Sequence, residues 1–193
     1  MNLIFDIGFN VGEFTQTCFN KYPTCNVIAV EANPNLVNGV SPHFFTNYNF
    51  TLHNNLVSNI EGEEIDFYVS PYATGVSTAS TEFMQNSRFT KGSKNLPENS
   101  IKWNEPIKIQ SITIDSMLER YGMPDLIKID VEGYEYNVLI GLTQKANDIC
   151  FEWHEEESEN FSTITPNQEN IFQEEYIPRR VVVFATIIYT TNG

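Results

Sequence analysis

Short apolar runs alternate with segments of helical periodicity from the first residues of this chain onward, and this alternation is the strongest constraint on its fold. Leu3–Ile7 is an apolar run ended by Gly8, which is typical of a buried strand. From Val11, apolar residues recur every three or four positions as far as Tyr22, which predicts a helix that Pro23 prevents from extending. Repeated alternation of this kind predicts a parallel sheet with helices on both faces.

The rest of the chain continues this pattern. The further predicted strands are Asn26–Glu31, Phe50–Val57, Glu64–Val69, Ile107–Ile112, Leu126–Asp130, Ile149–Trp153 and Val181–Ile188. Helices are predicted from Asn33-Pro34, over Asp115–Tyr121, from Val131, and around Gln168–Tyr176. Residues 70–106 are rich in Ser, Thr, Asn, Pro and Gly, and we expect them to form a long excursion with little regular structure. A loop of that length in a compact domain is usually functional or mobile.

Composition and charge exclude several classes of protein. A chain of 193 residues that is 41% hydrophobic can close the core of one α/β domain. The 25 acidic residues exceed the 11 basic ones and give a net charge of −14, which repels nucleic acid and anionic membrane surfaces. No apolar stretch approaches the roughly 20 residues of a spanning helix, and the N-terminus lacks a signal peptide's basic region. Three unpatterned cysteines suit a reduced protein, so we expect a cytoplasmic location.

Parallel sheets bind ligands beyond the carboxyl ends of their strands, so the residues that follow each strand are the candidates for chemistry. The first strand leads into Asp6-Ile7-Gly8-Phe9-Asn10-Val11-Gly12-Glu13. A dinucleotide fingerprint would need glycine at positions 8, 10 and 13, and Glu13 would repel a pyrophosphate, which disfavours NAD and FAD. The spacing suits a nucleoside with an amino-acid tail, whose amine can meet an acid. The alternative is a tight turn without a ligand.

Two polar residues follow the next strands. Glu31 ends the second strand 23 residues after Gly8, where a carboxylate can accept hydrogen bonds from both ribose hydroxyls. A solvated glutamate is the alternative. The third predicted strand ends near Asn54-Asn55-Leu56, and Asn55 there could bind an adenine edge, although asparagine is frequent throughout this chain.

The densest cluster of charge is Lys128-Ile129-Asp130-Val131-Glu132-Gly133-Tyr134-Glu135, at a strand-to-helix junction. Three carboxylates so close together repel one another, so part of the cluster should have raised proton affinity or a cationic partner. Alternation along the strand places Lys128 and Asp130 on the same face. The alternative is a set of acids on the first turn of a helix, which explains Glu132 and Glu135 better than Asp130.

Together these segments resemble the FkbM-type methyltransferases, a family of S-adenosylmethionine-dependent enzymes. The resemblance is carried by Phe5–Thr15, Val30–Pro34 and Ile114–Leu142, and its most specific part is Asp125–Glu135 followed by Val138-Leu139-Ile140-Gly141. It spans roughly residues 2–153 and is loose over 70–106 and after 155. The chain departs from the family in having Phe9 where Ala is frequent, and Val-Glu-Ala where Phe-Glu-Pro is frequent after the second strand.

The resemblance implies a Rossmann-like class I methyltransferase domain over residues 1–193, with a mostly parallel seven-stranded sheet and helices on both faces. Its cofactor would be S-adenosylmethionine. Carried over by position, the residues of the methionine and ribose side are Asp6, Gly8, Asn10 and Gly12, with Glu31 holding the ribose, Asn55 near the adenine and Asp130 closest to the transferred methyl group.

The family mostly methylates hydroxyl oxygens of sugars or natural products, so we expect a small-molecule or glycan acceptor. An alcohol needs a base, or a metal that lowers its pKa. Asp130 is the first candidate and His154 the second, while Glu132 and Glu152 could join Asp130 around Mg²⁺. The competing hypothesis is a non-catalytic nucleoside-binding or interaction domain.

Three aromatic residues lie in the long excursion or beside it. Tyr72, Phe89 and Trp103 could hold a sugar or a flat acceptor, or they could fasten the excursion to the body of the domain.

Overall fold

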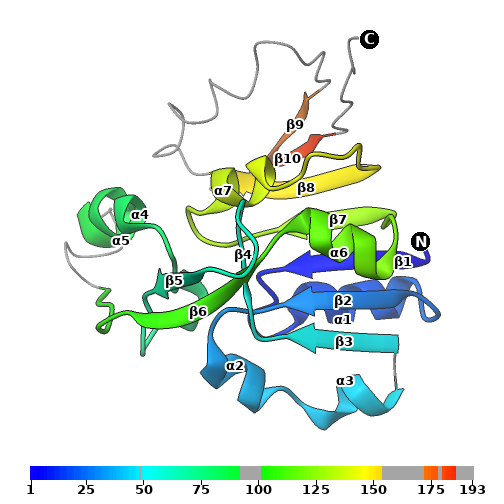
Figure 1. Cartoon of the computed structure of the whole chain (residues 1–193), viewed down its shortest axis with the longest axis horizontal. Coiled ribbons are helices and arrows are strands. Elements are labelled where there is room, and N and C mark those ends of the chain that lie inside the picture. The colour runs from blue at the N-terminus through cyan, green and yellow to red at the C-terminus, as the bar shows by residue number, and fades with distance from the viewer. Residues whose placement is uncertain (48, 92–100, 154–171, 178–179, 186–193) are drawn as a thin grey trace.

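The computed structural model describes residues 1–47, 49–91, 101–153, 172–177 and 180–185, and its centre is a seven-stranded sheet (Figure 1). The strands of this sheet are β1 (Leu3–Ile7), β2 (Asn26–Val30), β3 (Asn49–His53), β7 (Leu126–Ile129), β8 (Asp148–Trp153), β9 (Phe172–Ile177) and β10 (Arg180–Ala185). Their order is β3-β2-β1-β7-β8-β10-β9. Neighbours from β3 to β8 are parallel, whereas β10 is antiparallel to both β8 and β9. The predicted mostly parallel seven-stranded sheet is therefore confirmed.

The order of the strands reverses next to β1. The chain runs outward from β1 to β2 and β3, and it returns to the other side of β1 as β7. Such a reversal separates the loops that follow the two central strands and leaves a crevice at their carboxyl ends. The loops after β1 and β7 therefore border the place where this class of sheet binds ligands.

A second sheet of three short strands lies beside the first. It consists of β4 (Leu56–Val57), β5 (Glu64–Phe67) and β6 (Ile107–Ile112), in the order β4-β6-β5. The prediction of one strand over Phe50–Val57 is wrong, because the chain leaves the large sheet after His53 and joins the small one at Leu56. The side chain of Asn54 stabilises this exit by donating to the carbonyls of Glu31 and Ala32, at 2.9 and 3.1 Å.

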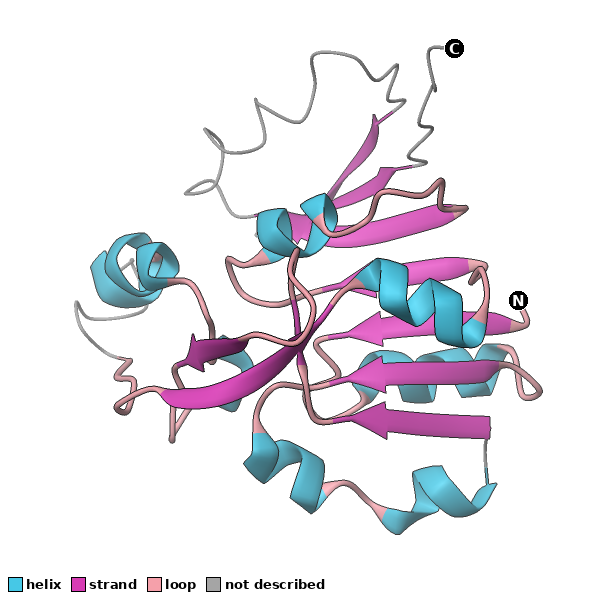
Figure 2. Cartoon of the chain, in the orientation of Figure 1, coloured by secondary structure: helices cyan, strands magenta, loops and turns pink. Residues whose placement is uncertain are grey.

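Helices cover both faces of the large sheet. They are α1 (Glu13–Lys21), α2 (Pro34–Gly39), α3 (Pro42–Asn47), α4 (Thr81–Asn86), α5 (Arg88–Lys91), α6 (Ile114–Tyr121) and α7 (Glu135–Ile140), with a 3-10 turn η1 (Thr74–Val76). Figure 2 shows α6 and α7 in front of the sheet and α1 behind it. The start of α2 is as predicted, because Pro34 is its first residue and the Asn33 side chain accepts the backbone N–H of Asn35 at 3.1 Å.

Strand alternation divides the core into two layers. On β1, Phe5 and Ile7 face the side of the sheet where α6 contributes Met117 and Leu118. The opposite face packs against α1 and α3. The residues of that second layer include Ile4, Val27, Ala29, Cys18, Phe19 and Phe44. Because successive side chains of a strand point to opposite faces, Asp6 lies on the α1 side of β1.

Three predictions differ from the structure. The excursion over 70–106 contains η1, α4 and α5, and α4 begins where Ser80 Oγ accepts the N–H of Phe83 at 3.0 Å. The predicted helix around Gln168–Tyr176 is wrong over its described part, because Phe172–Ile177 is strand β9, paired with β10. The helix predicted from Val131 begins only at Glu135.

The described residues include no helix with the length and apolar character needed to cross a membrane.

Candidate functional site

Two adjoining cavities lie at the carboxyl ends of the central strands. The smaller, of about 60 Å³, reaches Glu31 at the end of β2, and the larger, of about 370 Å³, reaches Glu152 on β8. Both are lined by Gly8, Asn10, Gly75, Asp130 and Glu132, so these residues form the boundary between the cavities. The larger cavity has the size of a small-molecule site, whereas the smaller one is narrow.

The loop after β1 is shaped by close backbone contact. Gly8 has φ +81°, and a Cβ at this position would lie 1.9 Å from the carbonyl oxygen of Asp130. The loops after β1 and β7 therefore touch at a point that only glycine permits. Gly12 has φ +87°, and a Cβ there would meet the rings of Phe9 and Phe44. Gly8 lines both cavities, while Gly12 lines neither and serves the packing of the loop.

Glu31 joins the loops that follow β1 and β2. Its side chain is buried, and its two oxygens accept the backbone N–H groups of Asn10 at 2.7 Å and Asn33 at 2.8 Å. Asn10 has φ +51°, an uncommon conformation for a residue other than glycine, and the bond to Glu31 stabilises it. Burial raises the pKa of Glu31, although these two hydrogen bonds oppose the rise. The carboxylate also lines the smaller cavity.

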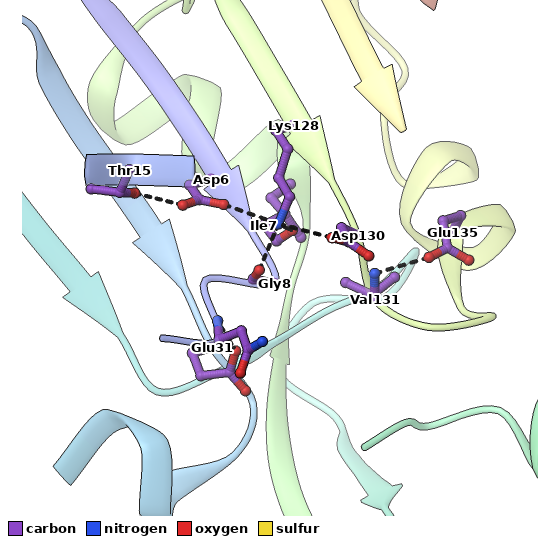
Figure 3. A network of polar contacts seen from close by, with 10 residues as sticks. Asp6, Ile7, Gly8, Thr15, Glu31, Lys128, Asp130, Val131 and Glu135 are labelled. Carbon is purple, nitrogen blue, oxygen red and sulfur yellow. Dashed lines mark hydrogen bonds and ion pairs between the residues drawn. The ribbon is translucent and has the colours of Figure 1, made fainter. Parts of the chain in front are cut away.

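A buried ion-pair network links β1 and β7 beneath the glycine loop (Figure 3). Lys128 Nζ lies 3.3 Å from Asp6 Oδ1 and 3.6 Å from Asp130 Oδ2, and it donates to the carbonyl of Gly8 at 2.6 Å. Asp6 also accepts the hydroxyl of Thr15 at 2.5 Å. Burial lowers the pKa of Lys128, but the Asp6 and Asp130 carboxylates together raise it by more. The net shift of the pKa is therefore upward, and the ammonium stays charged. The predicted shared face of Lys128 and Asp130 is confirmed.

Glu135 shapes the loop that carries Asp130 and Glu132. Its side chain is fully buried and accepts the backbone N–H group of Val131 at 2.9 Å (Figure 3). It also accepts the backbone N–H group of Gly133 at 2.9 Å. Glu132 and Gly133 have positive φ values of 54° and 88°, which bring those N–H groups around one carboxylate and delay the start of α7. Sequence reasoning placed Glu135 only as an acid on the first helical turn. The sequence signal for this role was that Glu135 lies two residues after Gly133, in the loop that follows strand β7.

The excursion between β5 and β6 packs against this same loop. Thr78 donates its hydroxyl to the carbonyl of Glu132 at 2.7 Å. A Cβ at Gly133 would lie 2.6 Å from Cβ of Phe83, so α4 is in direct contact with the loop backbone. Gly75 of η1 approaches the Asn10 side chain, where a Cβ would lie 3.4 Å from Nδ2. Sequence reasoning missed these three residues of the excursion, because no local pattern indicates such long-range contacts.

The contacts of the aromatic residues in the excursion do not decide between the two roles considered for them. Trp103 donates its indole N–H to the carbonyl of Val76 at 2.9 Å, and the ring of Phe89 lies 6.0 Å from that of Phe83. Both contacts lie within the excursion itself, so they do not test whether these rings fasten it to the body of the domain. Tyr72 is 96% exposed.

Three carboxylates meet at the edge of the larger cavity. Oxygens of Asp130, Glu132 and Glu152 lie within 4.8 Å of one another, and Glu152 is only 8% exposed. Among the described residues that line this cavity, Lys128 is the one cationic side chain. Oxygen atoms so arranged can bind a cation or several hydrogen-bond donors of a ligand.

The structure brings most of the predicted site residues together. Those that line the smaller cavity are Gly8, Asn10, Glu31, Asn55 and Asp130, and Asn55 also donates to the carbonyl of Gln110 at 3.0 Å. Asp6 lines neither cavity, because it is completely buried under the loop with Lys128 and Thr15. His154 lies outside the described residues.

Comparison with known proteins gives one family and several distant structures. The sequence model of the methyltransferase FkbM domain matches residues 6–176. No curated protein matches the chain. Precorrin-6y C5,15-methyltransferase from Geobacter metallireducens GS-15 has 11% identity and a TM-score of 0.46, over 98% of this chain and 80% of that one. Human methyltransferase-like protein 13, in complex with SAH, has 10% identity and a TM-score of 0.47, over 97% and 72%. The fibrillarin/Nop5p complex has 10% identity and a TM-score of 0.46, over 97% and 73%.

Proposed function

The chain belongs to the methyltransferase FkbM family, and from this premise we propose that it transfers a methyl group from S-adenosylmethionine to a hydroxyl oxygen of a small-molecule or glycan acceptor. The family is one of S-adenosylmethionine-dependent methyltransferases. The observation that carries the rest of the proposal is the position of Asp130, which borders both cavities. The carboxylate of Asp130 thus borders the smaller cavity, which reaches Glu31, and also the larger cavity, which has room for the acceptor.

The smaller cavity supports a role in binding the nucleoside. Its walls combine apolar side chains of Ile7, Val30 and Leu36 with the carboxylate of Glu31. Each carboxylate oxygen can accept two hydrogen bonds, so Glu31 can accept from ribose hydroxyls while it keeps its bonds to the loop. A volume of about 60 Å³ is too small for a nucleoside, and η1 (Thr74–Val76) lies against the loop at this point. We therefore expect η1 to move outward when the cofactor binds.

When bound, S-adenosylmethionine supplies an electrophilic methyl group on a positively charged sulfur. The chain's task is to hold the acceptor oxygen in line behind that group, near 3 Å, and to receive the proton that the hydroxyl loses. Asp130 Oδ1 is buried at the boundary of the cavities and has no hydrogen-bond partner among the described residues. It is the atom we assign to accept the hydroxyl proton, while Lys128 holds the other oxygen in place.

A divalent cation is the second part of this proposal. The three carboxylates Asp130, Glu132 and Glu152 offer the oxygen ligands that Mg²⁺ prefers. The Lys128 ammonium, 3.6 Å from Asp130, already supplies positive charge there and competes with a metal. Rates measured in EDTA and in added Mg²⁺ separate the two cases. A strict requirement for Mg²⁺ would assign the carboxylates to the ion, and equal rates would remove it from the mechanism.

The first test of the function is binding of S-adenosylhomocysteine, measured by calorimetry, with NADH as the matched negative ligand. We expect binding of the former only. Consumption of S-adenosylmethionine is then measured against a panel of sugar and polyphenol alcohols. Binding without turnover on any acceptor would favour the competing hypothesis of a non-catalytic nucleoside-binding domain. Absence of binding would refute both.

The role of Glu31 is tested by a double cycle, because this side chain also supports the loop. Adenosine and 2′,3′-dideoxyadenosine are each titrated into the wild type and into Glu31→Gln. If Glu31 binds the ribose, the wild type prefers adenosine by about tenfold or more, and the variant loses most of that preference. Equal losses for both ligands would assign Glu31 to the loop alone.

A further inference from the structure

Residues 69–77, which include η1, form one wall of the smaller cavity. Thr74, Gly75 and Ser77 line this cavity. Gly75 also lines the larger cavity and approaches the side chain of Asn10, where a Cβ would lie 3.4 Å from Nδ2. In this arrangement the smaller cavity holds about 60 Å³, which is less than a nucleoside requires. Residues 69–77 are therefore a lid that is closed over the nucleoside site in this structure.

The two ends of the lid are fixed to the rest of the domain. Tyr68 and Thr78 exchange two backbone hydrogen bonds, of 2.8 and 3.1 Å, and so close the lid as an antiparallel pair. The Thr78 hydroxyl donates to the carbonyl of Glu132 at 2.7 Å, which ties this pair to the loop after β7. The N–H of Asn104, which precedes β6, donates to the carbonyl of Val69 at 3.0 Å. A movement that enlarges the smaller cavity is therefore confined to the residues between these ends.

Two groups hold the middle of the lid in its closed position. Trp103 donates its indole N–H to the carbonyl of Val76 at 2.9 Å. Because the next residue, Asn104, is bonded to Val69, Trp103 belongs to the fixed side of this contact. The side chain of Val76 is buried. Neither Trp103 nor Val76 lines either cavity, so both stabilise the closed lid without occupying the space that a ligand would fill.

A contact of this kind lowers the affinity for a ligand that must displace the lid. The apparent dissociation constant is then the intrinsic constant divided by the fraction of molecules with an open lid. Removing one hydrogen bond from the closed state raises that small fraction by about three- to tenfold. Loss of the contact should therefore strengthen binding of the cofactor, whereas damage to the site itself would weaken it.

We infer that Trp103 is a positioning residue of the cofactor site, which holds the lid closed through Val76 and thereby sets the affinity for the cofactor. This inference rests on the proposed function. The nucleoside binds when the bond between Trp103 and Val76 opens and η1 moves outward between its fixed ends. The bond from Thr78 to the carbonyl of Glu132 stays in place during this movement, so the loop that carries Asp130 keeps its shape.

The first test is binding of S-adenosylhomocysteine, measured by calorimetry for the wild type and for Trp103→Phe. We expect the variant to bind about three- to tenfold more tightly. Tyr72→Leu is the matched control, because it changes a lid residue that is 96% exposed, and its affinity should equal that of the wild type. Unchanged or weaker binding by Trp103→Phe would overturn the inference. Val76→Ala weakens the same contact from the lid side, should also tighten binding, and decides the question if melting curves show that Trp103→Phe does not fold.

The fluorescence of Trp103 gives a second readout that does not depend on affinity. The chain has two tryptophans, so the emission of Trp153→Phe comes from Trp103 alone. Opening of the lid transfers the indole N–H from the Val76 carbonyl to water, and the emission should shift to longer wavelength when S-adenosylhomocysteine binds. An unshifted spectrum at saturation would contradict the inference.

Failure of the inference can be distinguished from failure of the proposed function. If S-adenosylhomocysteine does not bind to the wild type, the proposed function fails. If it binds, but Trp103→Phe gains no affinity and the emission of Trp103 does not shift, only the role of Trp103 and the lid is refuted.

Discussion

Replacing Glu135 by Gln is the sharpest test of how this chain builds its site. The Glu135 side chain is fully buried, and its carboxylate accepts the N–H groups of Val131 and Gly133 at 2.9 Å each. A glutamine can keep one of these bonds through its oxygen, but its amide NH₂ group then faces the other N–H. Losing a charge-assisted hydrogen bond and leaving a buried donor unpaired costs about 2–4 kcal/mol together. That is a large part of the roughly 5–15 kcal/mol that stabilises a domain.

The measurement is the free energy of unfolding from urea denaturation, with Glu82→Gln as the matched control. Glu82 also lies in the first turn of a helix, α4, but its side chain is exposed. The control should lose less than about 1 kcal/mol, the usual contribution of an acid at a helix N-terminus. A loss for Glu135→Gln within about 0.5 kcal/mol of the control's would refute the claim that this carboxylate organises the loop.

Three further predictions follow from the same structure. Burial, and secondarily the charge of Arg120, lower the pKa of His53 below its usual 6.5. The folded state therefore binds a proton at His53 less readily than the unfolded state, so stability is lost as the pH falls below about 6.5. His53→Gln should therefore lessen the decline in the free energy of unfolding between about pH 7 and pH 5, and an unchanged decline would contradict this. Burial raises the pKa of Cys150 to about 11, so at pH 8 only about a thousandth is thiolate, and Ellman's reagent should label it far more slowly in the native protein than in urea. Amide exchange in η1 should change when S-adenosylhomocysteine binds, because we expect Thr74–Val76 to move outward to admit the nucleoside, and identical exchange rates would speak against such a movement.

Local patterns were sufficient for several parts of the fold and the site. Leu3–Ile7 was predicted as a strand from its apolar run, and it is β1. Asn33-Pro34 was predicted to start a helix, because an asparagine cap and a proline at the first position are local preferences. The shared face of Lys128 and Asp130 follows from the two-residue period of a strand, and their ion pair confirms it.

Other parts could not be predicted because they depend on pairing between distant segments. Phe50–Val57 was predicted as a single strand, yet it is divided between two sheets because β4 pairs with β6, far along the chain. Phe172–Ile177 lies in a segment predicted as helical, and its pairing with β10 makes it a strand. The loop after β7 is stabilised by Thr78 and Phe83, which belong to an excursion that appeared unstructured from its composition.

The sequence alone determined the succession of strands and helices and the kinds of side chain at the strand ends, because hydrophobic period and capping chemistry act over a few neighbouring residues. Only the tertiary structure decided how those side chains are used. Glu31 and Glu135 each bind two backbone N–H groups, Asp6 is buried with Lys128, and Asp130 borders two cavities. Such assignments depend on distances between segments that are remote in the chain, and a one-dimensional pattern does not contain those distances.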